Sequence, residues 1–220
     1  MSMGSNRSAI IPTYAPPGSL VLGTASDAPG WGDGGPTSKS IIVSFGFWIF
    51  LLSDIVMFSA FFAAFQVAAG NAPGAAPHLD LRNLAIETIC LLISSFLCGI
   101  AALGAAERNY FLTEAGLFLA GILGAAFLWL EVREFASLAA THQGPSDGAY
   151  YSSFFALVGC HGLHVTVGLL WLGTMMAQIW AKGFRPEVLR RLVCFSLFWH
   201  ALDIVWVAIF SLVYLARFAP

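Results

Sequence analysis

The stretch ALVGCHGLHVTVGLL, residues 156–170, places His161 and His164 in a run of residues that are otherwise apolar or small. The apolar character continues in both directions and covers residues 150–179. A helix needs about 20 such residues to cross the hydrocarbon core of a bilayer, so this segment is long enough to span a membrane. It therefore predicts a transmembrane helix with two imidazole rings at membrane depth.

The composition of the whole chain also indicates a membrane protein. Of its 220 residues, 58% are hydrophobic and 10% are charged, and the mean hydropathy is +0.79, which is unlike an ordinary soluble domain. The formal net charge of -2 and the lack of a basic cluster exclude a nucleic-acid-binding surface. The four cysteines lie in apolar segments without C-x-x-C spacing, so we expect buried thiols rather than disulfides or a zinc site.

Five apolar segments are predicted to be transmembrane helices, and they define residues 41–216 as one membrane domain. Their approximate limits are 41–67, 84–105, 114–138, 150–179 and 192–214. Because an open sheet edge is not tolerated in lipid, the predicted fold is an all-α bundle. Residues 1–40 are rich in Gly, Pro, Ser and Thr and are expected to form a flexible tail. Small residues on the second and third segments should allow close helix approach: Gly99, Gly104, Gly116, Gly121 and Gly124.

The connections differ in their content of Lys and Arg, which predicts the orientation in the membrane. With the N-terminus inside, the inner side carries seven basic residues: Arg7, Lys39, Arg108, Lys182, Arg185, Arg190 and Arg191. The outer side then carries only Arg82 and Arg217. The positive-inside rule therefore predicts a cytoplasmic N-terminus and, after five spans, a periplasmic C-terminus.

Nine ionisable residues fall inside the predicted spans: Asp54, Glu87, Glu131, Arg133, Glu134, His161, His164, His200 and Asp203. A charge at the bilayer centre costs at least about 2.5–3.5 kcal/mol, so these groups should be paired and face the bundle interior, another subunit or water. Positions three apart lie about 60° apart on a helix, so Glu131/Glu134, His161/His164 and His200/Asp203 each form a one-sided polar pair. We expect one of the two glutamates to be protonated, or to be matched by Arg133 or by an imidazole on a neighbouring helix.

The same residues leave other chemistry open. His161 and His164 emerge from one helix face and cannot reach opposite faces of one haem, so haem ligation would need His200 together with one of them. A copper or zinc ion would need the three histidines and a carboxylate. Asp54 and Glu87 are lone carboxyl groups in apolar helices, and each is either a proton-relay group or a structural acid. The hypothesis favoured by the geometry is an interhelical hydrogen-bond cluster without catalytic, cofactor-binding or metal-binding residues.

Five blocks of sequence carry a family resemblance: GFWIFLLSDIVMFSAFFAAF (46–65), ETICLLISS (87–95), LEVREF (130–135), SFFALVGCHGLHVTVGLLWL (153–172) and SLFWHALDIVWVAIFSLVYL (196–215). In order and spacing they resemble subunit III of the haem–copper oxidases, over about residues 45–215. HGLHV and WHALDIVW are the most specific parts. The chain is most similar to the five-helix form of cytochrome o (bo-type) ubiquinol oxidases, because cytochrome c oxidase forms usually have two further helices at the front.

The resemblance implies a non-catalytic subunit of a proton-pumping ubiquinol oxidase in a bacterial inner membrane. Such a subunit supports the assembly and stability of a complex that oxidises ubiquinol and reduces oxygen to water. The haems and copper would lie in partner subunit I, the main contact, with subunits II and IV in the same complex and phospholipid in a helix cleft. The nine ionisable residues would then form a polar framework with lipid contacts. The alternatives are subunit III of a cytochrome c oxidase, a stand-alone proton channel or transporter, and a membrane cytochrome.

Overall fold

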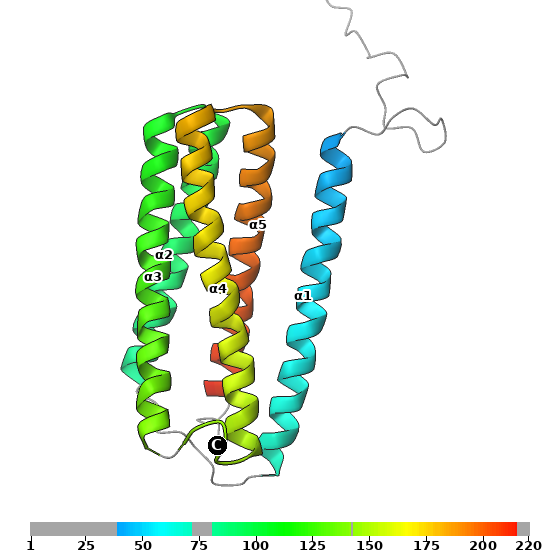
Figure 1. Ribbon diagram of the computed structural model, residues 1–220, viewed down its shortest axis with the longest axis vertical. Coiled ribbons are helices and arrows are strands. Elements are labelled where there is room, and N and C mark those ends of the chain that lie inside the picture. The colour runs from blue at the N-terminus through cyan, green and yellow to red at the C-terminus, as the bar shows by residue number, and fades with distance from the viewer. Residues whose placement is uncertain (1–38, 72–80, 142, 215–220) are drawn as a thin grey trace, which may run out of the picture. The chain divides into compact units, whose positions relative to one another are not determined.

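The structure is a computed structural model that describes residues 39–71, 81–141 and 143–214. These residues form five long helices and no strand (Figure 1): α1 (Lys39–Gly70), α2 (Leu81–Ala106), α3 (Tyr110–Ala140), α4 (Ala149–Lys182) and α5 (Pro186–Ile209), which a short π-helix, η1 (Phe210–Tyr214), continues. All five are long and apolar enough to cross a membrane, which confirms the predicted fold class. The tail predicted for residues 1–40 lies outside the described residues, except for the two that begin α1.

The helices extend beyond the apolar segments because capping residues set their ends. α3 begins at Tyr110 rather than near residue 114, and the side chain of Asn109 accepts a hydrogen bond from the backbone N–H of Leu112 at 3.2 Å. α4 continues to Lys182 and stops at Gly183, whose φ of 63° is a left-handed conformation that glycine adopts without strain. Pro186 then occupies the first turn of α5, where its missing N–H costs nothing.

Glycines allow α2 and α3 to approach closely, as the sequence predicts. A Cβ atom on Gly116 would lie 2.9 Å from the Cβ of Ala101, so the two helix backbones are nearly in contact there. At the connection, a Cβ on Gly104 would lie 3.1 Å from the backbone nitrogen of Thr113. Gly99 differs, because a Cβ at this position would meet nothing within 4 Å and the residue faces open space.

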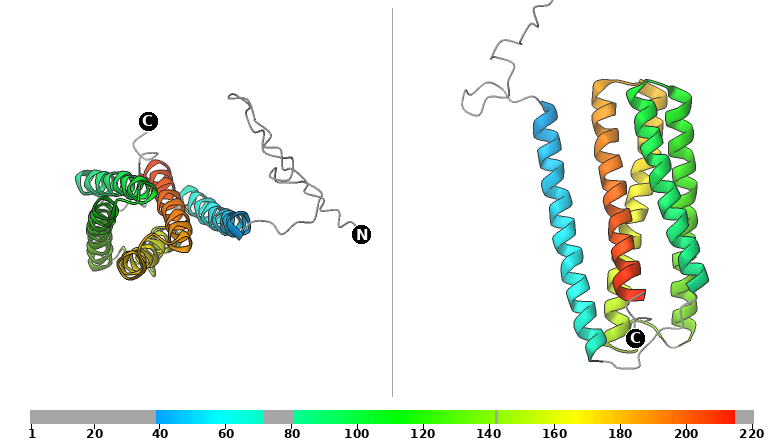
Figure 2. Two further views of the ribbon diagram at one scale, coloured as in Figure 1. Left: turned by 90° about the horizontal axis from the view of Figure 1, so that it is seen from above. Right: turned by 180° about the vertical axis from the view of Figure 1, so that it is seen from behind.

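Helices α2 to α5 surround a common core, and α1 lies beside them next to α4 and α5 (Figure 2). The buried apolar residues of α1 are Leu51, Phe58 and Phe65. They are seven residues, or about two helical turns, apart, so they form one stripe along the helix. Aromatic contacts join α1 to its neighbours, with ring centroids 6.0 Å apart for Phe47 and Trp171. The rest of the α1 surface is largely exposed.

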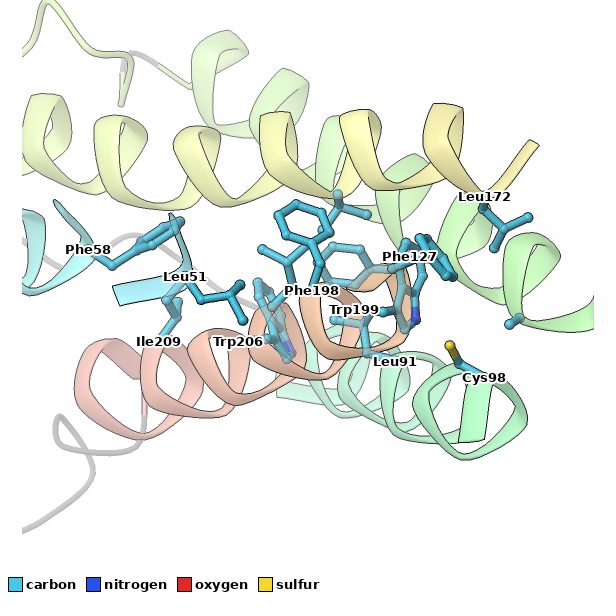
Figure 3. Packing of buried hydrophobic residues seen from close by; sticks show 14 of the residues in the cluster. Leu51, Phe58, Leu91, Cys98, Phe127, Leu172, Phe198, Trp199, Trp206 and Ile209 are labelled. Atoms are coloured by element: carbon cyan, nitrogen blue, oxygen red, sulfur yellow. The ribbon is translucent and has the colours of Figure 1, made fainter. Parts of the chain in front are cut away.

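Tryptophans from α5 fill the core of the bundle (Figure 3). The indole of Trp199 lies between α3 and α4, where Cβ atoms on Gly124 and Gly168 would each come within 2.9 Å of it. Trp206 packs edge-on against Phe127, with ring centroids 4.6 Å apart. Glycine on two helices thus provides the space for a large ring from a third.

The outer surface is apolar. Large side chains such as Phe111, Trp180 and Ile204 are 82%, 82% and 71% exposed, which would be unfavourable in water but suits lipid or a partner subunit. All four cysteines are free. Cys98 and Cys194 are buried, whereas Cys90 and Cys160 are only half-buried, so the expectation of four buried thiols is wrong for these two. Their helix faces are turned partly toward the outside of the bundle.

Candidate functional site

The ionisable residues do not gather in one cluster but lie in separate places among the helices. Asp54 and His164 join α1 to α4, and His161 lies in the aromatic core. Glu87 and Glu131 face the interior from α2 and α3. His200 and Asp203 line a groove between α2 and α5.

His164 connects α4 to α1. Its Nδ1 donates to the backbone carbonyl of Cys160 at 2.7 Å, and its Nε2 lies 4.0 Å from Oδ2 of Asp54. Each side chain is 20% exposed. The two side chains therefore face each other between α1 and α4, near the edge of the bundle.

His161 points elsewhere, although it is only three residues from His164. Its ring is fully buried and stacks on Trp206, with centroids 5.3 Å apart and planes 28° apart. Phe127 packs against it edge-on at 5.8 Å. Neither ring nitrogen has a hydrogen-bond partner in the part of the chain that the structure describes. The two histidines thus contact different neighbours.

The histidines do not form a joint metal-ligand set. Among residues 39–71, 81–141 and 143–214, no three His, Cys, Asp or Glu side chains are grouped in a way that could hold a metal ion. His161 contacts Trp206 and Phe127, His164 contacts Asp54, and His200 contacts α2. The copper or zinc constellation considered from the sequence is therefore not assembled.

Two glutamates are buried in the bundle without hydrogen bonds. Glu87 and Glu131 are 1% and 2% exposed, and none of their four carboxyl oxygens has a hydrogen-bond partner among the described residues. The Glu131 carboxyl group lies against Gly162 of α4, where a Cβ would come within 2.8 Å of Oε1. Glu131 also interacts electrostatically with Glu87 and Glu134. The interior of the bundle thus holds two carboxyl groups close enough to influence each other.

The expected partners of Glu131 are not found. It makes no hydrogen bond to an imidazole of residues 39–71, 81–141 or 143–214, and His161 is turned toward the rings of Trp206 and Phe127. Arg133 is exposed and cannot neutralise the carboxyl group, since positions two apart lie about 200° apart around a helix. Glu134 is half-buried. Both matching partners proposed from the sequence are therefore wrong for Glu131.

The predicted pair His200/Asp203 does share one environment. Ser95 of α2 forms a 2.7 Å hydrogen bond with Nδ1 of His200, and it also lies beside the Asp203 carboxyl group. Oδ1 of Asp203 is shielded from solvent and has no hydrogen-bond partner within the described ranges. These three residues line a groove of about 480 Å³ with apolar walls. The spacing correctly placed both residues on one face, but it did not identify Ser95.

Other polar contacts also escaped the sequence analysis. The indole N–H of Trp199 donates to Oγ of Ser94 at 3.2 Å, and Ser94 donates in turn to the carbonyl of Ala120 at 2.8 Å, which joins three helices. Trp206 donates to Oγ1 of Thr88 at 3.2 Å. The sequence could have indicated these contacts. A tryptophan in mid-span needs a hydrogen-bond partner for its N–H, and the hydroxyl residues of ETICLLISS lie at the same depth.

Fold and contacts together define a class, namely an all-helical multi-pass membrane protein whose ionisable and indole side chains join its helices. Residues 35–217 match the family model described as Cytochrome c oxidase subunit III. The chain is 45% identical over 174 residues to a cytochrome bo(3) ubiquinol oxidase subunit 3 of Pseudomonas aeruginosa, covering 78% of this chain and 83% of the relative. It is 39% identical over 175 residues to a quinol oxidase subunit 3 of Bacillus subtilis, covering 77% and 85%. The chain therefore belongs to the subunit III family of the haem–copper oxidases, which confirms the resemblance.

Proposed function

We propose that this chain is the non-catalytic subunit III of a proton-pumping cytochrome o ubiquinol oxidase in an aerobic respiratory chain. The complex oxidises ubiquinol and reduces oxygen to water, and this subunit supports its assembly and stability. The observation that carries the proposal is the similarity to quinol oxidase subunits over more than three quarters of the chain. In this proposal the haems and copper lie in subunit I.

The ionisable residues have a structural role in the proposal. His164 and Asp54 hold α1 against α4, and Ser95 and His200 hold α2 against α5. Apolar side chains gain little by leaving lipid for each other, so polar contacts of this kind position the helices. The exposed apolar faces contact lipid and the partner subunits, mainly subunit I, with subunits II and IV in the same complex.

The distribution of basic residues supports a cytoplasmic N-terminus in a bacterial inner membrane. Five basic residues lie in or beside the α2–α3 and α4–α5 connections: Arg108, Lys182, Arg185, Arg190 and Arg191. Figure 1 places both connections at the end of the bundle where α1 begins. Arg82, at the start of α2, lies at the opposite end. The positive-inside rule makes the first end cytoplasmic and places the C-terminus in the periplasm.

We further propose that a phospholipid binds in the cleft between α1 and the α4–α5 pair. The cleft measures about 500 Å³ and has apolar walls from Val43, Phe47 and Trp171. Arg190 and Arg191 stand at its rim with Glu187, and Arg191 also donates to the side-chain oxygen of Gln178 at 2.8 Å. Acyl chains suit the walls, and the arginines suit a phosphate group at the membrane surface.

Affinity purification of the tagged full-length chain in mild detergent tests the proposed function. We expect subunit I, its haems and quinol oxidase activity to co-purify, and we expect the isolated chain to lack a haem Soret band. Co-purification of a subunit with a dinuclear copper domain would instead indicate a cytochrome c oxidase. Purification without any oxidase subunit would contradict the proposal.

A further inference from the structure

The first turns of α1 diverge from the neighbouring helices. Of residues 41–50, only Phe47 is partly buried, and the other nine are exposed. Further along the helix, Leu51, Phe58 and Phe65 are buried. Figures 1 and 2 show α1 next to α4 at the C-terminal end of α1 and moving away from it toward the N-terminal end. The helix is therefore packed against the bundle over only part of its length.

The side-chain contacts of α1 follow the same division. Oδ2 of Asp54 lies 4.0 Å from Nε2 of His164, and the ring of Phe58 lies 5.3 Å from the ring of the same histidine. Closer to the N-terminal end, the ring of Phe47 lies 6.0 Å from that of Trp171. Residues 41–45 precede all of these contacts, and we call them the lid segment.

Gly46 lies at the boundary between the lid segment and the attached part of α1. An added Cβ would meet nothing within 4 Å, so this glycine does not make room for a neighbour as Gly116 and Gly162 do. Glycine inside a helix is less stable than alanine because its backbone is freer, and it is a residue at which helices bend. Gly46 thus provides backbone freedom at the point where α1 leaves its neighbours.

The lid segment forms part of the wall of the proposed phospholipid cleft. Val43 belongs to the lid segment, whereas Trp171 and Cys194 line the cleft from α4 and α5. The space between these walls measures about 500 Å³. Membrane helices associate through van der Waals packing, which favours contact between two such walls. A phospholipid whose phosphate group is bound by Arg190 at the rim would keep them apart.

We propose that the lid segment hinges at Gly46 and is held open by the phospholipid in the cleft. The inference rests on the proposed function, because it requires the phospholipid site described there. When the lipid leaves, the lid segment closes and Val43 approaches Trp171 and Cys194. The position of the first turns of α1 therefore depends on whether the cleft is occupied.

Disulfide trapping in the purified, assembled oxidase measures the position of the lid segment. Val43→Cys supplies one thiol, and the native Cys194 on the opposite wall supplies the other. A disulfide requires two Cβ atoms about 3.5–4.5 Å apart, so its yield reports how often the lid segment closes. The protein is oxidised with its phospholipid retained in mild detergent, and again after washing with excess dodecyl maltoside. Mass spectrometry of unreduced peptides gives the yield.

We expect a low yield with phospholipid retained and a higher yield after its removal, and adding phosphatidylglycerol should lower the yield again. Phe45→Cys is the matched control in the lid segment. Position 45 lies about 200° from position 43 around the helix, so it should form no disulfide with Cys194 in either state. Arg190→Gln should raise the yield from Val43→Cys before any washing, whereas Arg185→Gln, outside the cleft, should not.

Gly46→Ala tests the hinge without introducing a clash. Alanine is favoured over glycine inside a helix by a factor of about two to five, so the yield from washed Val43→Cys protein should fall by about two- to fivefold. Gly173→Ala on α4 is the control, because a Cβ there would also meet nothing within 4 Å. It should leave the yield unchanged.

Native mass spectrometry of the same samples separates the lid from the proposed function. If the parent protein retained no phospholipid, or if Arg190→Gln retained as much as the parent, the phospholipid site of the proposed function would be overturned. Retained phospholipid together with the same disulfide yield before and after washing would overturn the lid alone. Equal yields from positions 43 and 45 would also overturn the lid, and an unchanged yield in Gly46→Ala would overturn the hinge.

Discussion

Gly162 follows the first histidine of HGLH, and the structure gives this glycine a defined role. The Glu131 carboxyl group of α3 lies directly against it, so that an added Cβ would be 2.8 Å from Oε1, 2.9 Å from Oε2 and 3.1 Å from Cδ. The Glu131 side chain is only 2% exposed and has little room to move away. Gly162→Ala should therefore force α3 and α4 apart or displace the carboxyl group.

Two opposing contributions determine the size of the effect. Overpacking of a buried contact costs about 1–3 kcal/mol. Replacing glycine by alanine inside a helix stabilises the helix by about 0.5–1 kcal/mol, because alanine has less backbone freedom to lose on folding. The net destabilisation by Gly162→Ala is then between about 0 and 2.5 kcal/mol. In a Glu131→Ala background the clash is absent, and the same substitution should stabilise the protein by about 0.5–1 kcal/mol.

A double-mutant cycle measures this coupling. The free energy of unfolding is obtained by titrating the detergent-solubilised protein with a denaturing detergent, for the parent, both single variants and the double variant. We expect a coupling energy of about 1–3 kcal/mol between Gly162→Ala and Glu131→Ala. Gly173→Ala serves as the control on the same helix, because its Cβ would enter open space. It should be neutral or stabilising in both backgrounds.

Additive effects would refute the reasoning. If Gly162→Ala changed stability equally with Glu131 present and absent, the carboxyl group would not lie against α4. A destabilisation that also appeared in Gly173→Ala would point to a general intolerance of alanine in α4 rather than to the Glu131 contact. The first result would require a different orientation of α3.

Three further predictions follow from other contacts. His164→Leu should reduce co-purification with the oxidase, because the unpaired Asp54 carboxyl costs roughly 1–3 kcal/mol, while the haem spectrum of the remaining complex stays unchanged; haem loss with normal assembly would contradict this. Trp199→Ala should lower the free energy of unfolding by about 3–5 kcal/mol in the same detergent titration, since a buried indole is removed. Arg190→Gln should reduce phospholipid retention in native mass spectrometry, whereas Arg185→Gln, outside the cleft, should not.

The five spans could be predicted because the bilayer imposes their length and apolarity, whatever the helices contact. The close approach of α2 and α3 was also readable, since Gly104 and Gly116 leave room that larger residues would fill. The same reasoning does not apply to every glycine. Gly99 is also a glycine in the apolar part of α2, but it faces open space because it lies on the outer face of the helix. Composition identifies small residues and does not identify which face of a helix they occupy.

The contacts of the ionisable residues were harder to predict, and His161 and His164 show why. A spacing of three residues correctly places them about 60° apart on α4. Because α4 has neighbours on several sides, an angle of about 60° is enough for two of its side chains to contact different helices. His161 contacts Trp206 of α5, and His164 contacts Asp54 of α1. The pair His200/Asp203 did share an environment because α2 borders that face of α5. Sequence spacing fixes angles on one helix, whereas contacts depend on how its neighbours are rotated.

The attachment of α1 illustrates what decides such rotations in a membrane. Its buried stripe of Leu51, Phe58 and Phe65 resembles the interface of a soluble helix, yet lipid would accommodate these residues almost equally well. The contact between Asp54 and His164 has no such equivalent, because a carboxyl group turned toward lipid loses every partner. We therefore propose that the polar contact selects the rotation of α1 that also buries the stripe. Ionisable residues at membrane depth can therefore specify helix positions without taking part in chemistry.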